Sequence, residues 1–326
     1  MDTLIPFFTA AVVAGTPLLF GTLGEILTEK SGNLNLGVEG MMFMGAVSGL
    51  ATVFLLELGF GLEISGFVAV LLAILGAFLA GAFGALLYSV MVVSFRAQQN
   101  VTGLALTIFG TGFGNFFGEF FGRFTPGPAM RISSSAQEGF ASLQIPLLSD
   151  IPILGPLLFS YNILVYLAVA LAILMAIFLN RTRWGLNLRA VGENPATADA
   201  ASINVTHYKY LATCVGGGIC GLGGMYIAMV NMSGVWVHNA VYGQGWIAVA
   251  LVIFVTWSPG RALWGALVFG GLMVMRLYVP LGIPMQIYDM FPFLATILVL
   301  IAASIRQSKE HSPPGLLGEN YFREER

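Results

Sequence analysis

The chain has 326 residues, of which 9% are Asp, Glu, Lys or Arg and 57% are apolar, and its formal net charge at pH 7 is −2. A soluble domain carries about 25% charged residues, so this composition excludes a water-soluble globular protein and predicts a membrane protein. The small negative charge also excludes a nucleic-acid partner, because no basic stretch can neutralise a run of phosphates.

Nine apolar windows approach the roughly 20 residues that a membrane-spanning helix needs. They lie at residues 4–28, 39–57, 65–94, 100–121, 160–180, 207–230, 243–258, 262–280 and 290–306. The sequence therefore predicts an all-α polytopic membrane protein with about nine transmembrane helices in residues 1–306. A solvated cytoplasmic tail is expected over residues 307–326.

The segment between the first two windows, residues 31–40 (SGNLNLGVEG), interrupts the apolar sequence with three glycines and with Asn33, Asn35 and Glu39. Irregular backbone and carboxylates are tolerated at membrane depth only where they face protein or a water-filled cavity. We therefore predict a broken helix near 31–40 that lines a translocation path. The alternative is a simple cytoplasmic turn capped by asparagine.

Further candidates for the path lie in later spans. Asn100 and Thr102 begin the fourth window, where capping of the helix is the alternative role. Asn115 shares a helix face with Glu119, which fits either a lumen-facing position or hydrogen bonding between helices. Trp246 fits either stacking on a purine ring or anchoring at the membrane interface.

Two polar loops are long enough to carry a function. Residues 122–158 form a Pro-punctuated loop, which either contacts the interface or a partner or is a solvated connector. In the second loop, residues 181–206, Asn194 followed by Pro195 is a typical helix start, because Asn caps free N–H groups and Pro lacks only an unpaired donor. The alanine-rich sequence that follows predicts a short helix near 194–203, which is either a docking helix or an ordinary capped loop helix.

Lys and Arg residues predict the orientation, because cytoplasmic loops collect them. With the N-terminus outside, 11 of the 14 basic residues lie inside, and only Arg123, Arg131 and Arg276 lie outside. The expected topology is N-out and C-in, with the loop at 122–158 extracytoplasmic and the loop at 181–206 cytoplasmic. One span more or fewer near residues 25–45 would change this parity.

The sequence contains no motif for chemistry of its own. The nucleotide-binding loop needs Gly directly before its Lys, and no lysine of this chain has one. Cys214 and Cys220 have no metal-site spacing, and the three histidines are scattered over the chain. We expect no catalytic residue, metal or cofactor in this chain.

Three segments resemble the permeases of the ABC-importer superfamily for branched-chain amino acids, ribose and nucleosides. They are residues 15–46 (GTPLLFGTLGEILTEKSGNLNLGVEGMMFMGA), 181–205 (RTRWGLNLRAVGENPATADAASINV) and 253–270 (IFVTWSPGRALWGALVFG). The middle segment is similar to the coupling pattern TRxGxxxRAxGxNxxAAxxxGI, with Ser202 where that family usually has Gly. The first and third are most similar to the nucleoside or simple-sugar permease subgroup.

The resemblance implies a permease subunit of a multi-pass importer in the bacterial inner (plasma) membrane. Two permease chains, a paralogue or a second copy, would form the path, and an extracytoplasmic binding lipoprotein would deliver a small-molecule substrate. Separate cytoplasmic ATPase subunits would bind ATP and Mg²⁺. The residues implied in coupling to the ATPase are Arg183, Arg189, Glu193, Asn194, Pro195, Ala198, Asp199 and Ala201.

The expected substrate is a nucleoside, and the alternative is a simple sugar such as ribose; subgroup similarity at the Trp257-x-Pro259 turn favours the nucleoside. A competing function is proton-coupled secondary transport through Glu25, Glu39 or Glu119. That class commonly has paired broken helices, whereas only one broken segment is evident in this sequence. An intramembrane enzyme would need converging His, Asp or Ser side chains, which the sequence does not indicate.

Overall fold

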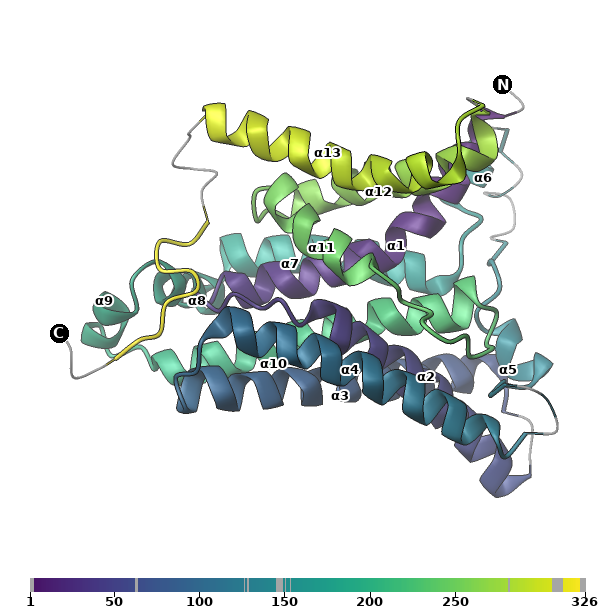
Figure 1. Ribbon diagram of the computed structural model, residues 1–326, viewed down its shortest axis with the longest axis horizontal. Helices are drawn as coiled ribbons and strands as arrows, with labels where there is room; N and C mark the ends of the chain where they lie inside the picture. The colour runs from purple at the N-terminus through teal and green to yellow at the C-terminus, as the bar shows by residue number, and fades with distance from the viewer. Residues whose placement is uncertain are drawn as a thin grey trace.

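The computed structural model describes the chain except for residues 1–2, 62–63, 126, 128, 145–148, 150, 153, 281, 307–312 and 323–326. In the described residues, every regular element is a helix. One isolated antiparallel bridge pairs Arg131 with Val235. The long helices run mostly along the longest axis of the molecule, and the two termini lie at opposite ends of it (Figure 1). The all-α prediction is confirmed.

Eight long elements form the bundle. They are α1 (Leu4–Glu29), α2 (Val38–Phe60), α3 (Gly66–Ser89) with the π-helical turn η1 (Val90–Ser94), α4 (Gln99–Gly122), α7 (Ile163–Arg181), α10 (Val205–Tyr226) with η2 (Ile227–Asn231), α12 (Pro259–Tyr278) and α13 (Met285–Arg306). Shorter helices connect them: α5 (Ser134–Glu138), α6 (Leu154–Leu158), α8 (Arg183–Glu193), α9 (Pro195–Ala200) and α11 (Gln244–Phe254).

Seven helices in the described residues, rather than the nine expected, are long and apolar enough to cross a membrane. The window at 243–258 forms only the 11-residue α11, because a turn with Thr256 and Trp257 in the left-handed region ends it. The last window lies in α13, a helix of 22 residues that contains Pro292. Nine spans are therefore not confirmed.

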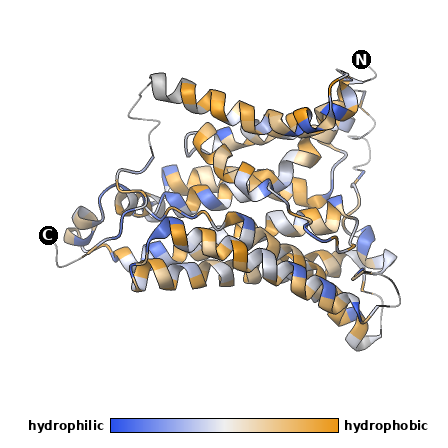
Figure 2. Cartoon of the chain, viewed as in Figure 1, coloured by the Kyte–Doolittle hydropathy of each residue, from blue (hydrophilic) through white to orange (hydrophobic). Residues whose placement is uncertain are grey.

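Glycines bring the central helix α10 into backbone contact with its neighbours α1, α2 and α3. A Cβ added to Gly221 would lie 2.4 Å from the carbonyl oxygen of Ala77, and one on Gly224 would lie 1.8 Å from that of Met42. Close approach of this kind replaces the hydrophobic effect as the packing force between membrane helices. Apolar residues cover most of the length of the long helices (Figure 2), which matches a bundle surrounded by lipid.

These contacts predict a large cost for the smallest possible side chain. Gly224→Ala should lower the unfolding free energy by about 1–3 kcal/mol, because the methyl group overpacks against the α2 backbone. The control is Gly112→Ala on α4, where an added Cβ meets nothing within 4 Å. Thermal melting of the purified chain in detergent measures both. Equal melting temperatures for the two variants would contradict this packing.

Candidate functional site

The predicted interruption after α1 is present, because residues 30–37 are irregular and buried between α1 and α2. Asn35 donates from its backbone N and its Nδ2 to the Glu25 carboxylate, at 3.1 and 3.2 Å, and its Oδ1 accepts from the Gly37 N–H at 2.9 Å. The Asn33 Nδ2 donates to Thr213 Oγ1 at 2.9 Å. Both asparagines are fully buried and hold the break by hydrogen bonds within the protein.

Side chains from α3 and α4 bind the backbone of the same segment. Gln99 Oε1 accepts from the Leu34 N–H at 2.7 Å, and the Tyr88 hydroxyl donates to the Leu34 carbonyl at 2.6 Å. Buried backbone groups need such partners in place of water. Hydrogen bonds inside the protein therefore hold this segment between α1 and α2.

A second interruption lies at the start of α11, in the second half of the chain. The Glu39 carboxylate, in the first turn of α2, accepts from the backbone N–H groups of Gly243 and Gly245 at 2.6 Å each. Helix α11 begins there, near the middle of the long axis (Figure 1). The first turns of α2 and α11 thus meet at one carboxylate, an arrangement that the sequence analysis missed. The glycine at position 243 was the available signal for a turn in the sequence, and in the structure it has a φ of +78°.

The loop before α11 is tied to α4 by polar pairs. Asn115 Nδ2 donates to Asn239 Oδ1 at 2.8 Å, and the Asn239 N–H donates to Asn115 Oδ1 at 3.0 Å. One turn further along α4, Glu119 lies 2.7 Å from His238 Nδ1. Asn115 therefore bonds to this loop and not to another helix.

Exposed aromatic side chains accompany these amides. Tyr242 is 83% exposed and Trp246, in the first turn of α11, is 36% exposed. Of the sequence-predicted path residues, the structure thus places Glu39, Asn115 and Trp246 around one loop. For brevity we call residues 237–246 the α11 entry loop.

Asn100 and Thr102 lie elsewhere, in the first turns of α4. Asn100 is exposed, and Thr102 Oγ1 donates to the Gln98 carbonyl at 2.9 Å. Thr102 also lines an apolar groove of about 460 Å³ between α3 and α4. No hydrogen bond among the described residues joins either of them to the α11 entry loop.

The predicted cytoplasmic helix is α9. Asn194 caps it by accepting from the Thr197 N–H at 3.0 Å, and Pro195 occupies its first turn, as expected. Ala196, Thr197, Ala200 and Ala201 are exposed. These four residues form a nearly bare face that we call the α9 outer face.

Ala198 does not belong to the α9 outer face. It is 3% exposed and packs with Val191 and Val205 of its own chain. Residues three apart share a helix face, so Ala198 turns inward together with the buried Pro195. Of the residues expected in docking, Arg183, Glu193, Asn194 and Ala201 are exposed, whereas Arg189 and Asp199 are half-buried.

Ser202, which stands where the family pattern has Gly, occupies the left-handed region at a φ of +63°. It follows the end of α9, and the next N–H, of Ile203, donates back to the Ala198 carbonyl at 3.0 Å. This is the Schellman termination, which favours Gly at the left-handed residue. The turn keeps its geometry with serine, at a conformational cost of roughly 1 kcal/mol.

Part of the expected tail, residues 313–322, makes hydrogen bonds to this region. The Gly318 N–H donates to the Gly32 carbonyl at 3.1 Å, and the Leu316 N–H to the Gly192 carbonyl at 3.3 Å. The Tyr321 hydroxyl donates to Asp199 of α9 at 3.0 Å. The rest of the predicted tail, with Lys309, Arg323 and Arg326, lies outside the described residues.

Long apolar helices, two interruptions inside the bundle and a capped helix exposed at one end define a polytopic membrane protein of the transporter class. The family model for the branched-chain amino acid transport system / permease component matches residues 7–301, and the chain belongs to this family. It is therefore the permease subunit of an ABC transporter and a multi-pass membrane protein.

Several permease proteins are similar to this chain over most of its length. A guanosine ABC transporter permease protein of Bacillus subtilis (NupQ) is 36% identical over 89% of both chains. A nucleoside ABC transporter permease protein of Lactococcus lactis (NupC) is 34% identical over 92% of both. A putative glucose ABC transporter permease protein of Haloferax volcanii (TsgC13) is 35% identical over 97% of both. A second, less similar permease protein matches from each of these organisms (NupP, NupB and TsgB13), and no solved structure matches.

Proposed function

We propose that this chain is the permease of a nucleoside importer. The observation that carries the proposal is the similarity, over about nine tenths of the chain, to two permeases named for guanosine and for nucleosides. The relative named for glucose supports a simple sugar as the second candidate substrate. The chain itself offers no P-loop, so separate ATPase subunits would bind ATP and Mg²⁺ and supply the energy.

The α11 entry loop offers chemistry that suits a nucleoside. The exposed rings of Tyr242 and Trp246 can stack on a purine. The Asn115 and Asn239 amides, which carry donors and acceptors, can exchange their mutual hydrogen bonds for bonds to the base or ribose. We place the substrate path along this flank of α4, with Glu39 fixing the start of α11 beside it.

Asn33 and Asn35 receive a different role in this proposal. Because both are buried and bonded to protein groups, we assign them to holding the break between α1 and α2. Asn100 and Thr102, near the opposite end of α4 from Asn115, would meet substrate only as it leaves the path.

The α9 outer face supports docking to an ATPase subunit, because its small side chains fit closely into a groove on a partner. This end of the molecule would then be cytoplasmic, with the N-terminus outside. The second permease proteins of the same three organisms favour a paralogue as the other half of the path. An extracytoplasmic binding lipoprotein would deliver the substrate.

Competition for uptake tests the substrate. In cells expressing the complete importer, unlabelled guanosine and other nucleosides should suppress uptake of labelled guanosine, whereas excess ribose, glucose or leucine should not. Suppression by glucose or ribose but not by nucleosides would transfer the chain to the sugar importers.

A further inference from the structure

A polar pocket of about 300 Å³ opens near the end of the bundle that carries α8. Its walls come from the residue after α1, the end of α7, α8 and the turn that starts α12. It is lined by Lys30, Asn180, Arg189, Ser258 and Arg261, together with Leu179, Thr256, Trp257 and Pro259. Neither the path nor the α9 outer face uses this pocket.

The pocket concentrates positive charge. The side chains of Lys30 and Arg189 make no hydrogen bond or ion pair with the residues that the structure describes, and the Arg189 Nε is buried without a partner. Arg261 donates from Nη1 to Thr256 Oγ1 at 2.5 Å. Ser258 precedes α12 without capping it by its side chain, so the positive end of the helix dipole adds to the field.

Nearby carboxylates have other partners. Glu29 accepts from the Trp257 indole N–H, and Glu193 accepts from the Gly315 N–H at 3.0 Å. Burial lowers the pKa of Lys30 and the nearby Arg189 lowers it further, while the charges of Glu193 and Glu29 raise it. The side chains of Lys30 and Arg189, which have no hydrogen-bond partner among the described residues, therefore favour an anion in the pocket.

An apolar groove of about 360 Å³ adjoins the basic pocket. It runs between α7 and α12, is lined by Ala172, Ile173, Ala176, Ile177 and Leu263, and shares Asn180 with the pocket. The two compartments also meet along both helices. Arg181 and Gly260 line the groove, and their chain neighbours Asn180 and Pro259 line the pocket. One polar and one apolar compartment thus meet at the end of two membrane helices.

We propose that this composite site binds an anionic phospholipid, with its phosphate beside Lys30 and Arg189 and an acyl chain in the α7–α12 groove. Basic pockets between transmembrane helices on the cytoplasmic side are suited to anionic headgroups. A free phosphate ion or a carboxylate of the ATPase would leave the adjoining groove without a role. Because Arg189 belongs to the coupling segment and Lys30 directly precedes the break, a bound lipid would join these two regions.

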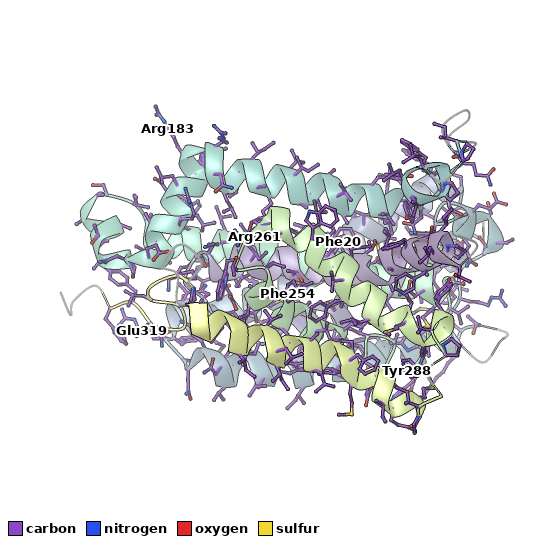
Figure 3. All side chains as sticks on the ribbon, turned by 90° about the horizontal axis from the view of Figure 1, so that it is seen from above. Phe20, Arg183, Phe254, Arg261, Tyr288 and Glu319 are labelled. Atoms are coloured by element: carbon purple, nitrogen blue, oxygen red, sulfur yellow. The ribbon has the colours of Figure 1, made fainter. Side chains whose placement is uncertain are left out.

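Lipid binding to the purified full-length chain in detergent tests the proposal. Native mass spectrometry should show that phosphatidylglycerol binds more tightly than phosphatidylcholine. Arg189→Gln should weaken phosphatidylglycerol binding about fivefold, the effect of one basic group near a headgroup. The matched control is Arg183→Gln, because Arg183 lies on the same helix but points outward at the edge of the molecule (Figure 3). This control should bind like the wild type.

Two further arms identify the source of the anion. Ala176→Trp, which fills the groove without changing charge, should also weaken phosphatidylglycerol binding, and millimolar inorganic phosphate should not displace the lipid. If phosphate displaced phosphatidylglycerol and Ala176→Trp had no effect on its binding, the pocket would be a site for a free anion and not for a lipid. Equal binding of phosphatidylglycerol and phosphatidylcholine would overturn the proposed site. It would also be overturned if the Arg189→Gln variant kept its affinity for phosphatidylglycerol but no longer bound the ATPase subunit. The assay needs no transport, so its failure is distinguishable from a failure of the proposed function.

Discussion

Replacing Glu39 with alanine is expected to destabilise the chain by about 2–5 kcal/mol and to abolish transport. The Glu39 carboxylate accepts from the backbone N–H groups of Gly243 and Gly245, and the side chain is 5% exposed. Each buried N–H group left without an acceptor costs about 1–3 kcal/mol. Loss of both bonds would free the start of α11 and with it the entry loop that carries Tyr242 and Trp246.

Thermal melting in detergent and uptake normalised to the amount of permease in the membrane measure this effect. Glu39→Gln should be intermediate, because its amide offers one acceptor and turns a donor toward the other N–H group. Glu119→Ala is the matched control for stability. Its partner His238 is also exposed, and such exposed pairs contribute about 0–1 kcal/mol. A Glu39→Ala chain that melts and transports like the wild type would refute the role of this contact.

Ala200→Arg is expected to abolish ATP-driven uptake while leaving the fold intact. Ala200 belongs to the exposed α9 outer face, so an arginine there meets only water in the isolated permease. In a complex with the ATPase, the same charge would be buried without a partner. This would cost about 3–5 kcal/mol of binding free energy, which weakens the affinity for the ATPase by at least about a hundredfold.

Two comparison variants separate docking from folding. Ala198→Arg should lower the melting temperature, because Ala198 is packed between Val191 and Val205. Ser142→Arg places the same charge at an exposed position in the loop between α4 and α7 and should change neither property. Co-purification with the ATPase, melting and uptake measure all three variants. Normal uptake by Ala200→Arg would remove α9 from the coupling surface.

Patterns confined to a few neighbouring residues predicted the local features well. Asn194 followed by Pro195 begins α9 as expected, because capping depends on side chains next to the helix end. The glycine- and asparagine-rich segment after α1 likewise breaks the helix where predicted. Contacts between distant segments were not predictable in this way. Contacts with Val191 and Val205 decide which side of α9 turns inward, and the sequence of a six-residue helix does not predict this side by itself.

Two larger differences concern the length of α11 and the end of the chain. The window at 243–258 has the composition of a span, but the turn at Thr256 and Trp257 ends α11 after 11 residues. The final residues were expected in a solvated tail, yet backbone hydrogen bonds to Gly32 and Gly192 hold Leu316 and Gly318. The pairing of a backbone N–H group with a distant carbonyl leaves no composition signal, whereas the turn before Pro259 was visible in the sequence and only its effect on the length of α11 was missed.

The second interruption also changes the reasoning about energy coupling. A single broken helix in the sequence was an indication against a proton-coupled secondary transporter, whereas α11 provides a second interruption beside Glu39. That indication is therefore lost. The assignment to ABC transport now rests on family membership across residues 7–301 and on relatives that are themselves permease proteins of ABC transporters.

Reconstituted transport tests this assignment most directly. Proteoliposomes would contain the chain with its candidate permease paralogue and ATPase, and would receive the binding protein and labelled guanosine. Uptake should require ATP and all of these subunits, and a proton gradient alone should drive none. Uptake of guanosine by the isolated chain, driven by a proton gradient in the absence of ATPase and ATP, would contradict the account.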